Sequence, residues 1–140
     1  MKKQQRGIAL IEAMIACVIL AIGLVGTLGL QARAQSALLQ ADQRAEAAMA
    51  GEKLLGIMSN DQGANQANLL NYVKTATGTA PAALAPWLAE TRKLMPSAAV
   101  TVVVTLDSPG LTRVDLTIEW VRKKDDKPDQ HRLTTYIAAS

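Results

Sequence analysis

The hydrophobic and polar positions follow three different patterns along the chain, and the first is an unbroken apolar run. Residues 8–30 are apolar on every side, and the only charged side chain among them is Glu12. Such a stretch forms a helix of about 35 Å at about 1.5 Å per residue, enough to cross a hydrocarbon core of about 30 Å. The pattern therefore predicts a membrane-spanning helix.

After Leu30 the apolar run changes to an amphipathic pattern. Apolar residues recur at helical spacing on one face, and polar residues lie largely opposite. The residues on this apolar face are Leu38, Ala41, Ala45 and Met49. No proline occurs before Pro81, so we expect one continuous helix from Ile8 to about Ser59, ended by the polar segment "SNDQG".

After Pro96 the period changes from helical to two. Apolar and polar residues alternate over 100–106, 114–120 and 133–137, which predicts three strands. The segment Asp107-Ser108-Pro109-Gly110 joins the first two, since proline fixes φ and glycine accepts a reversed backbone. The strands would form an antiparallel sheet with one apolar face, covered by the second half of the long helix.

Two shorter helices are expected before the strands, at Asn65–Thr75 and Pro86–Leu94. The predicted fold class is therefore α+β, with a long N-terminal helix packed on a small three-stranded antiparallel sheet. Trp87 and Trp120 would lie in the core or at helix–sheet contacts; an exposed Trp87 would instead indicate a partner surface.

The charge distribution gives the orientation of the span. The net charge of +3 comes from Lys2, Lys3 and Arg6, because the rest of the chain carries equal numbers of basic and acidic residues. Basic residues before a span stay cytoplasmic, so the C-terminal part would be periplasmic. The single cysteine, Cys17, lies within the span, which leaves no intramolecular disulfide.

Three glycines interrupt the span at a spacing of three residues: Gly23, Gly26 and Gly29. Each costs roughly 1 kcal/mol relative to alanine in a helix interior. They indicate either close packing against another helix or a softened zone that can stretch. Simple tolerance of glycine inside a membrane span is the third interpretation.

Glu12 is the residue that a plain membrane anchor does not explain. A charge at the centre of a span costs about 2.5–3.5 kcal/mol, and less near the boundary. A cleaved secretory signal would have a shorter apolar region, and a proton carrier would need polar partners on other spans. Cleavage after Gly7 would instead create an α-amino group on Ile8, and the amine of one subunit could meet the Glu12 carboxylate of the next.

The segment "RGIALIEAMIACVILAIGLVGTLGLQ" at residues 6–31 resembles the class III signal of type IV pilins and pseudopilins. The matching features are a short basic leader, Gly7, an apolar residue after it, Glu12, and an uninterrupted helix. The stretch "VILAIGLVGTLGLQARA" at residues 18–34 is most similar to the PilV group of minor pilins. The head is matched only in general layout.

The resemblance implies a structural role without enzymatic activity. Prepilin peptidase would cut between Gly7 and Ile8 and N-methylate Ile8, and Glu12 would engage the neighbouring subunit during assembly. The expected partners are prepilin peptidase, other minor pilins, the major pilin and the pilus assembly platform. The chain would sit in the inner membrane and then in the pilus. Its expected parts are a cleaved leader (1–7), a transmembrane assembly helix (8–30), its amphipathic continuation (31–62) and a periplasmic head (63–140).

This chain departs from many major pilins in three ways. Ile8 replaces the usual phenylalanine, the helix has no proline, and no C-terminal cysteine pair closes the last loop. These departures favour a minor pilin or a pseudopilin over a major subunit. We expect a minor pilin with a role at or near the filament tip. The alternatives are a type II secretion pseudopilin and a membrane-tethered periplasmic binding module.

Other chemistry has little support in the sequence, and we expect neither a metal nor another cofactor. His131 is the only histidine, and a solvated or capping position is expected for it. Asp125, Asp126 and Asp129 lack the spacing of a calcium loop. The basic residues around them have acidic neighbours and no interleaved aromatic residues, so nucleic acid is not expected as a partner. These basic residues are Arg122, Lys123, Lys124 and Lys127.

Overall fold

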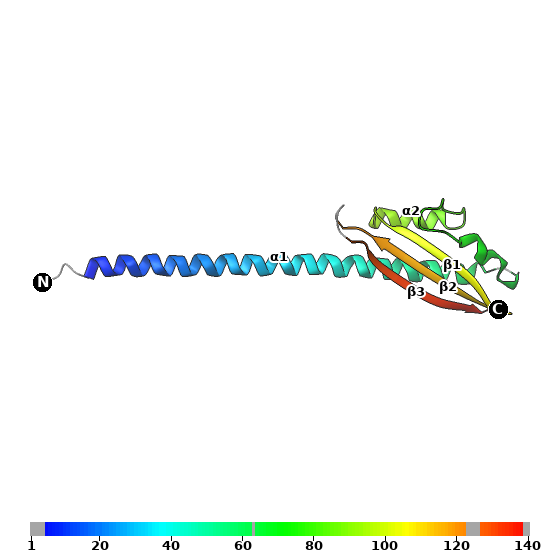
Figure 1. Ribbon diagram of the computed structural model, residues 1–140, viewed down its shortest axis with the longest axis horizontal. Coiled ribbons are helices and arrows are strands. Elements are labelled where there is room, and N and C mark those ends of the chain that lie inside the picture. The colour runs from blue at the N-terminus through cyan, green and yellow to red at the C-terminus, as the bar shows by residue number, and fades with distance from the viewer. Residues whose placement is uncertain (1–4, 63, 123–126, 139–140) are drawn as a thin grey trace. The chain divides into compact units, whose positions relative to one another are not determined.

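The computed structural model describes residues 5–62, 64–122 and 127–138, with side chains except at 5–8, 64 and 65. The elements follow one another as shown in Figure 1: α1 (Gln5–Asn60), the 3-10 helix η1 (Ala64–Tyr72), α2 (Ala85–Leu94), β1 (Ala99–Ser108), β2 (Leu111–Trp120) and β3 (Asp129–Ala138). The chain divides after Ala41 into two compact units, so α1 contributes residues to both.

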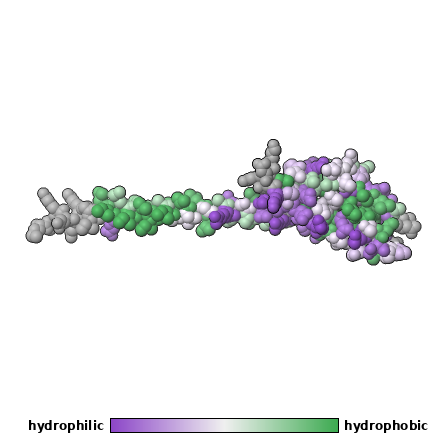
Figure 2. Space-filling view, in the orientation of Figure 1, coloured by the Kyte–Doolittle hydropathy of each residue, from purple (hydrophilic) through white to green (hydrophobic). Residues whose placement is uncertain are grey.

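The first unit is the N-terminal part of α1. Every described side chain from Ala9 to Leu39 is exposed. In Figure 2, apolar residues cover most of the visible face of the N-terminal stretch of this part, and hydrophilic residues appear further along it. By length and composition, α1 is the one helix among the described residues that could cross a membrane. The predicted continuous helix is confirmed, and it ends within a residue of the expected position.

The second unit contains a three-stranded antiparallel sheet in the order β1-β2-β3. The turn between β1 and β2 contains Gly110 with φ of 79°, as the sequence predicts. The pairing of β2 with β3 is continuous, whereas that of β1 with β2 shifts register between Leu106 and Ser108. The predicted α+β class is therefore confirmed.

The core lies between one face of the sheet and the helical segments that cover it. Alternate residues of β1 and β2 supply the buried sheet face: Val100, Val102, Val114, Leu116, Ile118 and Trp120. From α1, the buried residues are Ala47, Gly51, Leu54 and Met58. Trp87 and Leu88 of α2 also belong to the core, with fractional exposures of 4% and 3%. Both tryptophans are thus buried, as expected.

The prediction of which face of the amphipathic helix covers the sheet is wrong. The members of the expected face, Leu38, Ala41, Ala45 and Met49, are exposed, and the sheet is instead covered by the stripe that begins at Ala47. Alanine is frequent on several faces of α1, so helical spacing alone does not distinguish the buried stripe. Leu106 is also exposed, at 64%, because β1 leaves its regular register at this residue.

The short helix expected at Asn65–Thr75 is a 3-10 helix that ends at Tyr72. Gln66 has φ of 62°, which an α-helix does not accommodate. Its buried side-chain amide donates a hydrogen bond to the carbonyl of Ile137 (2.6 Å) and accepts one from the hydroxyl of Thr112 (2.7 Å). These tertiary contacts hold the unusual backbone.

Candidate functional site

The candidate processing site lies near the start of α1. The backbones of Gly7 and Ile8 belong to this helix, and the side chain of Ile8 lies outside the described part of the structure. Glu12 follows Ile8 by four residues, so the two positions share one face of the helix, about 6 Å apart along its axis. A processing enzyme would therefore have to release Gly7 and Ile8 from the helix.

The Glu12 side chain is exposed and surrounded along α1 by exposed apolar residues, such as Leu10, Ile11 and Ile15. Within the described residues it makes no hydrogen bond and no ion pair. A carboxylate in lipid is costly without a cation or hydrogen-bond donors. The geometry thus makes the carboxylate available to a group on another molecule.

Comparison with known proteins gives a match in the same region. The family described as "Prokaryotic N-terminal methylation motif" matches residues 2–28, which include Gly7, Ile8 and Glu12. The match supports a type IV pilin-like protein. No curated protein and no solved structure matches the chain.

The motif has consequences for processing and for location. A signal of this prepilin type implies processing by prepilin peptidase and partners from the pilus family. Together with the long apolar helix, it is consistent with anchoring in a membrane. Proteins of this structural family are typically not enzymes.

The three glycines of the apolar segment are helical and have open space around them. A Cβ atom added at Gly23, Gly26 or Gly29 would meet no atom within 4 Å. Thr27, between them, donates a hydrogen bond to the carbonyl of Leu24 (2.9 Å) and so satisfies its hydroxyl within the helix. Close packing against another helix and local softening both remain predictions for these glycines.

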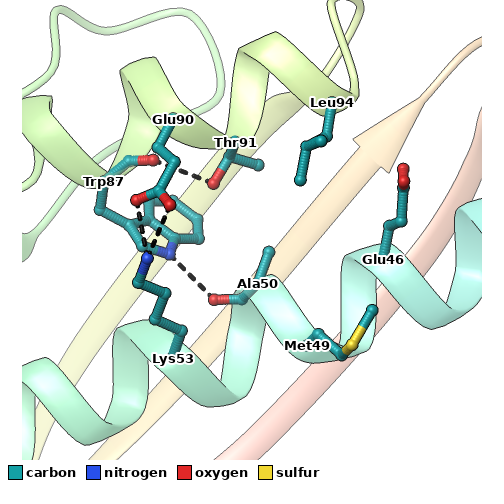
Figure 3. Close-up of a pocket in the computed structure, with 8 residues that line it drawn as sticks. All are labelled: Glu46, Met49, Ala50, Lys53, Trp87, Glu90, Thr91 and Leu94. Atoms are coloured by element: carbon teal, nitrogen blue, oxygen red, sulfur yellow. Dashed lines mark hydrogen bonds and ion pairs between the residues drawn. The ribbon is translucent and has the colours of Figure 1, made fainter.

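A groove in the second unit lies between α1 and α2 and has a volume of about 220 Å³ (Figure 3). Its lining is mostly apolar, and Met49 and Leu94 are both more than 60% exposed. The lining residues are Glu46, Met49, Ala50, Lys53, Trp87, Glu90, Thr91 and Leu94.

Two polar contacts cross this groove and connect the helices. The Trp87 indole N–H donates to the carbonyl oxygen of Ala50 at 2.9 Å. The Lys53 ammonium donates to both carboxylate oxygens of Glu90, at 2.8 and 2.7 Å. These hydrogen bonds hold the pKa of Glu90 below its usual value. The sequence gives no signal for either contact, because the partners are far apart along the chain.

The other residues considered in the sequence analysis lie partly outside the described residues. Over residues 5–62, 64–122 and 127–138, no group of three His, Cys, Asp or Glu side chains could hold a metal ion. Asp129 pairs with Arg44 (3.6 Å) and Arg122 (3.2 Å). Asp125, Asp126, Lys123 and Lys124 lie outside the described residues.

His131 differs from its expected solvated position. It lies on the face of β3 that is directed toward α1, next to the buried core residue Ile118 in the cross-strand pairing. The residue is half-buried, and its Nε2 atom is shielded from solvent. The alternation of side chains along β3 directs His131 inward. The sequence did not indicate this, because a polar loop directly precedes the strand.

Proposed function

We propose that the chain is a minor pilin of a type IV pilus, most like the PilV group, and takes part in pilus assembly at or near the filament tip. One observation carries this proposal. The exposed carboxylate of Glu12 lies in the apolar part of α1 and in the matched motif, and it pairs with no other described residue. Its role is structural, and its mechanism is energetic rather than catalytic.

Processing supplies the cation that Glu12 lacks. Prepilin peptidase cuts the bond between Gly7 and Ile8 and methylates the new amine, which remains positively charged. Between staggered parallel helices, this amine on one subunit reaches the Glu12 carboxylate of the next. At about 4 Å and an effective dielectric near 20, the pair attracts by roughly 4 kcal/mol before desolvation.

The pair sets the register of the helices more than it adds net stability, because removing both charges from water offsets much of the attraction. The surrounding apolar side chains pack against neighbouring helices. Gly23, Gly26 and Gly29 let those helices approach closely or bend. The periplasmic head then contacts other minor pilins.

The test of this proposal is the substitution Glu12→Ala, with Glu12→Asp as the matched control that keeps the charge. Glu12→Ala should be processed normally but enter sheared pili at a level roughly tenfold below wild type, as loss of about 1.4 kcal/mol would produce. Glu12→Asp should retain more incorporation. Normal incorporation of Glu12→Ala would contradict the pairing.

A deletion strain distinguishes this role from that of a type II secretion pseudopilin. The proposal predicts loss of pilus-driven motility with protein secretion intact. Loss of secretion with normal motility would assign the chain to the secretion system instead.

A further inference from the structure

The two edges of the sheet differ in how their backbone groups are satisfied. The edge of β1 is closed at Val102, whose N–H donates to the carbonyl of Lys74 (2.8 Å) and whose carbonyl accepts from the Lys74 N–H (3.0 Å). At the other edge, β3 is the last strand, and no described segment pairs with its outer side.

The Lys74 contact also determines which groups of β3 point outward. In an antiparallel sheet, both backbone groups of a residue point to the same side, and successive residues alternate. Since Val102 directs its groups toward Lys74, its partner Leu116 directs its own groups toward Leu133 on β3.

The alternation then continues along β3, because its pairing with β2 has no register shift. Leu133 and every second residue from it bond to β2. From Gln130 to Tyr136, the residues whose N–H and C=O groups point away from the sheet are Gln130, Arg132, Thr134 and Tyr136. In the described residues, none of these outward backbone groups has a hydrogen-bond partner.

Such an edge is a template for another strand, and proteins often blunt it with charged side chains, proline, bulges or short length. β3 is 10 residues long, contains neither proline nor glycine, and has no bulge. An extended polypeptide has donors and acceptors at the same spacing, so it can pair with these outward groups.

The side chains along β3 indicate the composition of that polypeptide. Among the four outward residues, the only charged side chain is that of Arg132, and it forms no ion pair with a described residue. Leu133 is half-buried on the opposite face, with part of its side chain uncovered. An acidic residue beside Arg132 and an apolar residue beside Leu133 would complement both faces.

We infer that β3 is a docking edge for an extended acidic–apolar segment of another protein subunit, which adds as a fourth strand. A second copy of this chain is the less favourable occupant, because it would bring a second unpaired Arg132 to the same edge. This inference concerns the second unit alone and does not depend on cleavage after Gly7.

The experiment uses the full chain in detergent micelles and a fluorescent peptide of alternating valine and glutamate. Fluorescence anisotropy should show saturable binding, and a peptide of alternating valine and lysine should bind at least about tenfold more weakly. The same valine–glutamate peptide with alternate backbone nitrogens methylated should not bind, because it cannot complete the strand.

Two variants of Thr134 distinguish the contribution of the backbone N–H to peptide binding from that of the side chain. Thr134→Pro removes an outward N–H that β2 does not use, which an edge strand tolerates. It should weaken peptide binding at least about tenfold. Thr134→Val is the control. Like the proline variant, it lacks the threonine hydroxyl, which donates to Asp115 at 2.7 Å, but it keeps the backbone N–H. It should bind the peptide within about threefold of wild type.

Several results would overturn the inference. These are the absence of peptide binding, equal binding by Thr134→Pro in a protein with unchanged circular dichroism, or equal binding of the lysine peptide. A concentration-dependent dimer that Thr134→Pro abolishes would assign the edge to a second copy of this chain instead.

Discussion

Gly51 on α1 lies so close to Leu133 on β3 that a Cβ atom added to Gly51 would overlap the Leu133 Cδ1 atom. The fully buried Leu116 stands 3.3 Å from the same position. The absence of a side chain at Gly51 therefore allows α1 to approach the sheet. Gly56, one and a half turns further along the helix, has open space around it.

The first prediction compares alanine at these two glycines. Gly51→Ala should have a lower free energy of unfolding than Gly56→Ala by about 1 kcal/mol or more, because the terminal methyl group of Leu133 must move and Leu116 leaves little room. Gly56→Ala should raise the free energy of unfolding by about 0.5–1 kcal/mol, since alanine has the higher helix propensity and its Cβ atom would meet no neighbouring atom. Thermal unfolding of the full chain in detergent measures both, and equal melting temperatures for the two variants would contradict the proposed close approach.

The second prediction concerns the hydrogen bond from Trp87 to Ala50. Trp87→Phe keeps most of the buried ring but removes the donor, and it should destabilise the fold by about 1–3 kcal/mol. The exposed Lys53–Glu90 pair offers a control, because Lys53→Met should change the stability by less than about 1 kcal/mol. If Trp87→Phe unfolds at the wild-type temperature, the indole N–H does not contribute to docking of α2.

The third prediction is a pH dependence centred on Tyr72. Burial raises the pKa of Tyr72 from 10.0 to about 12, assisted by its hydrogen bond to Asp61 (2.7 Å) and by the negative charge of that carboxylate. Because the folded state holds this proton more tightly than the unfolded state, Tyr72 stabilises the fold below pH 10. That contribution should be lost as the pH rises from about 10 to about 12.

Ultraviolet titration can isolate Tyr72, because the chain has only one other tyrosine, Tyr136. In a Tyr136→Phe variant, tyrosinate should form with a midpoint near 12. Adding Asp61→Asn should lower this midpoint, since it removes the negative charge. A midpoint near 10 with Asp61 intact would show that Tyr72 is not buried against that carboxylate.

The strands and the long helix could be predicted from the sequence because each is encoded by a local period. The alternation ending at Trp120 gives one face of β2, and the turn at Gly110 joins this strand to β1. Glu12 can also be identified from the sequence, since an acidic residue in an apolar run is conspicuous without any tertiary information.

The remaining features depend on contacts between distant residues. The buried Lys74 ammonium donates to three carbonyl oxygens, those of Thr75, Ala76 and Val100, and no local pattern indicates that a lysine would be buried there. Burial lowers its pKa, with a smaller contribution from Arg92. The open edge of β3 is likewise a property of the assembled sheet, because it depends on β3 being the outermost strand on that side.

The central claim is that processing gives this chain a positively charged N-terminus to pair with Glu12. Mass spectrometry of the protein extracted from membranes tests it most directly, with a strain lacking prepilin peptidase as the control. We predict a chain that begins at N-methylated Ile8, and an unprocessed chain in the control strain. A chain that retains Met1 in the presence of the peptidase, or one that begins near Gln35, would contradict the claim.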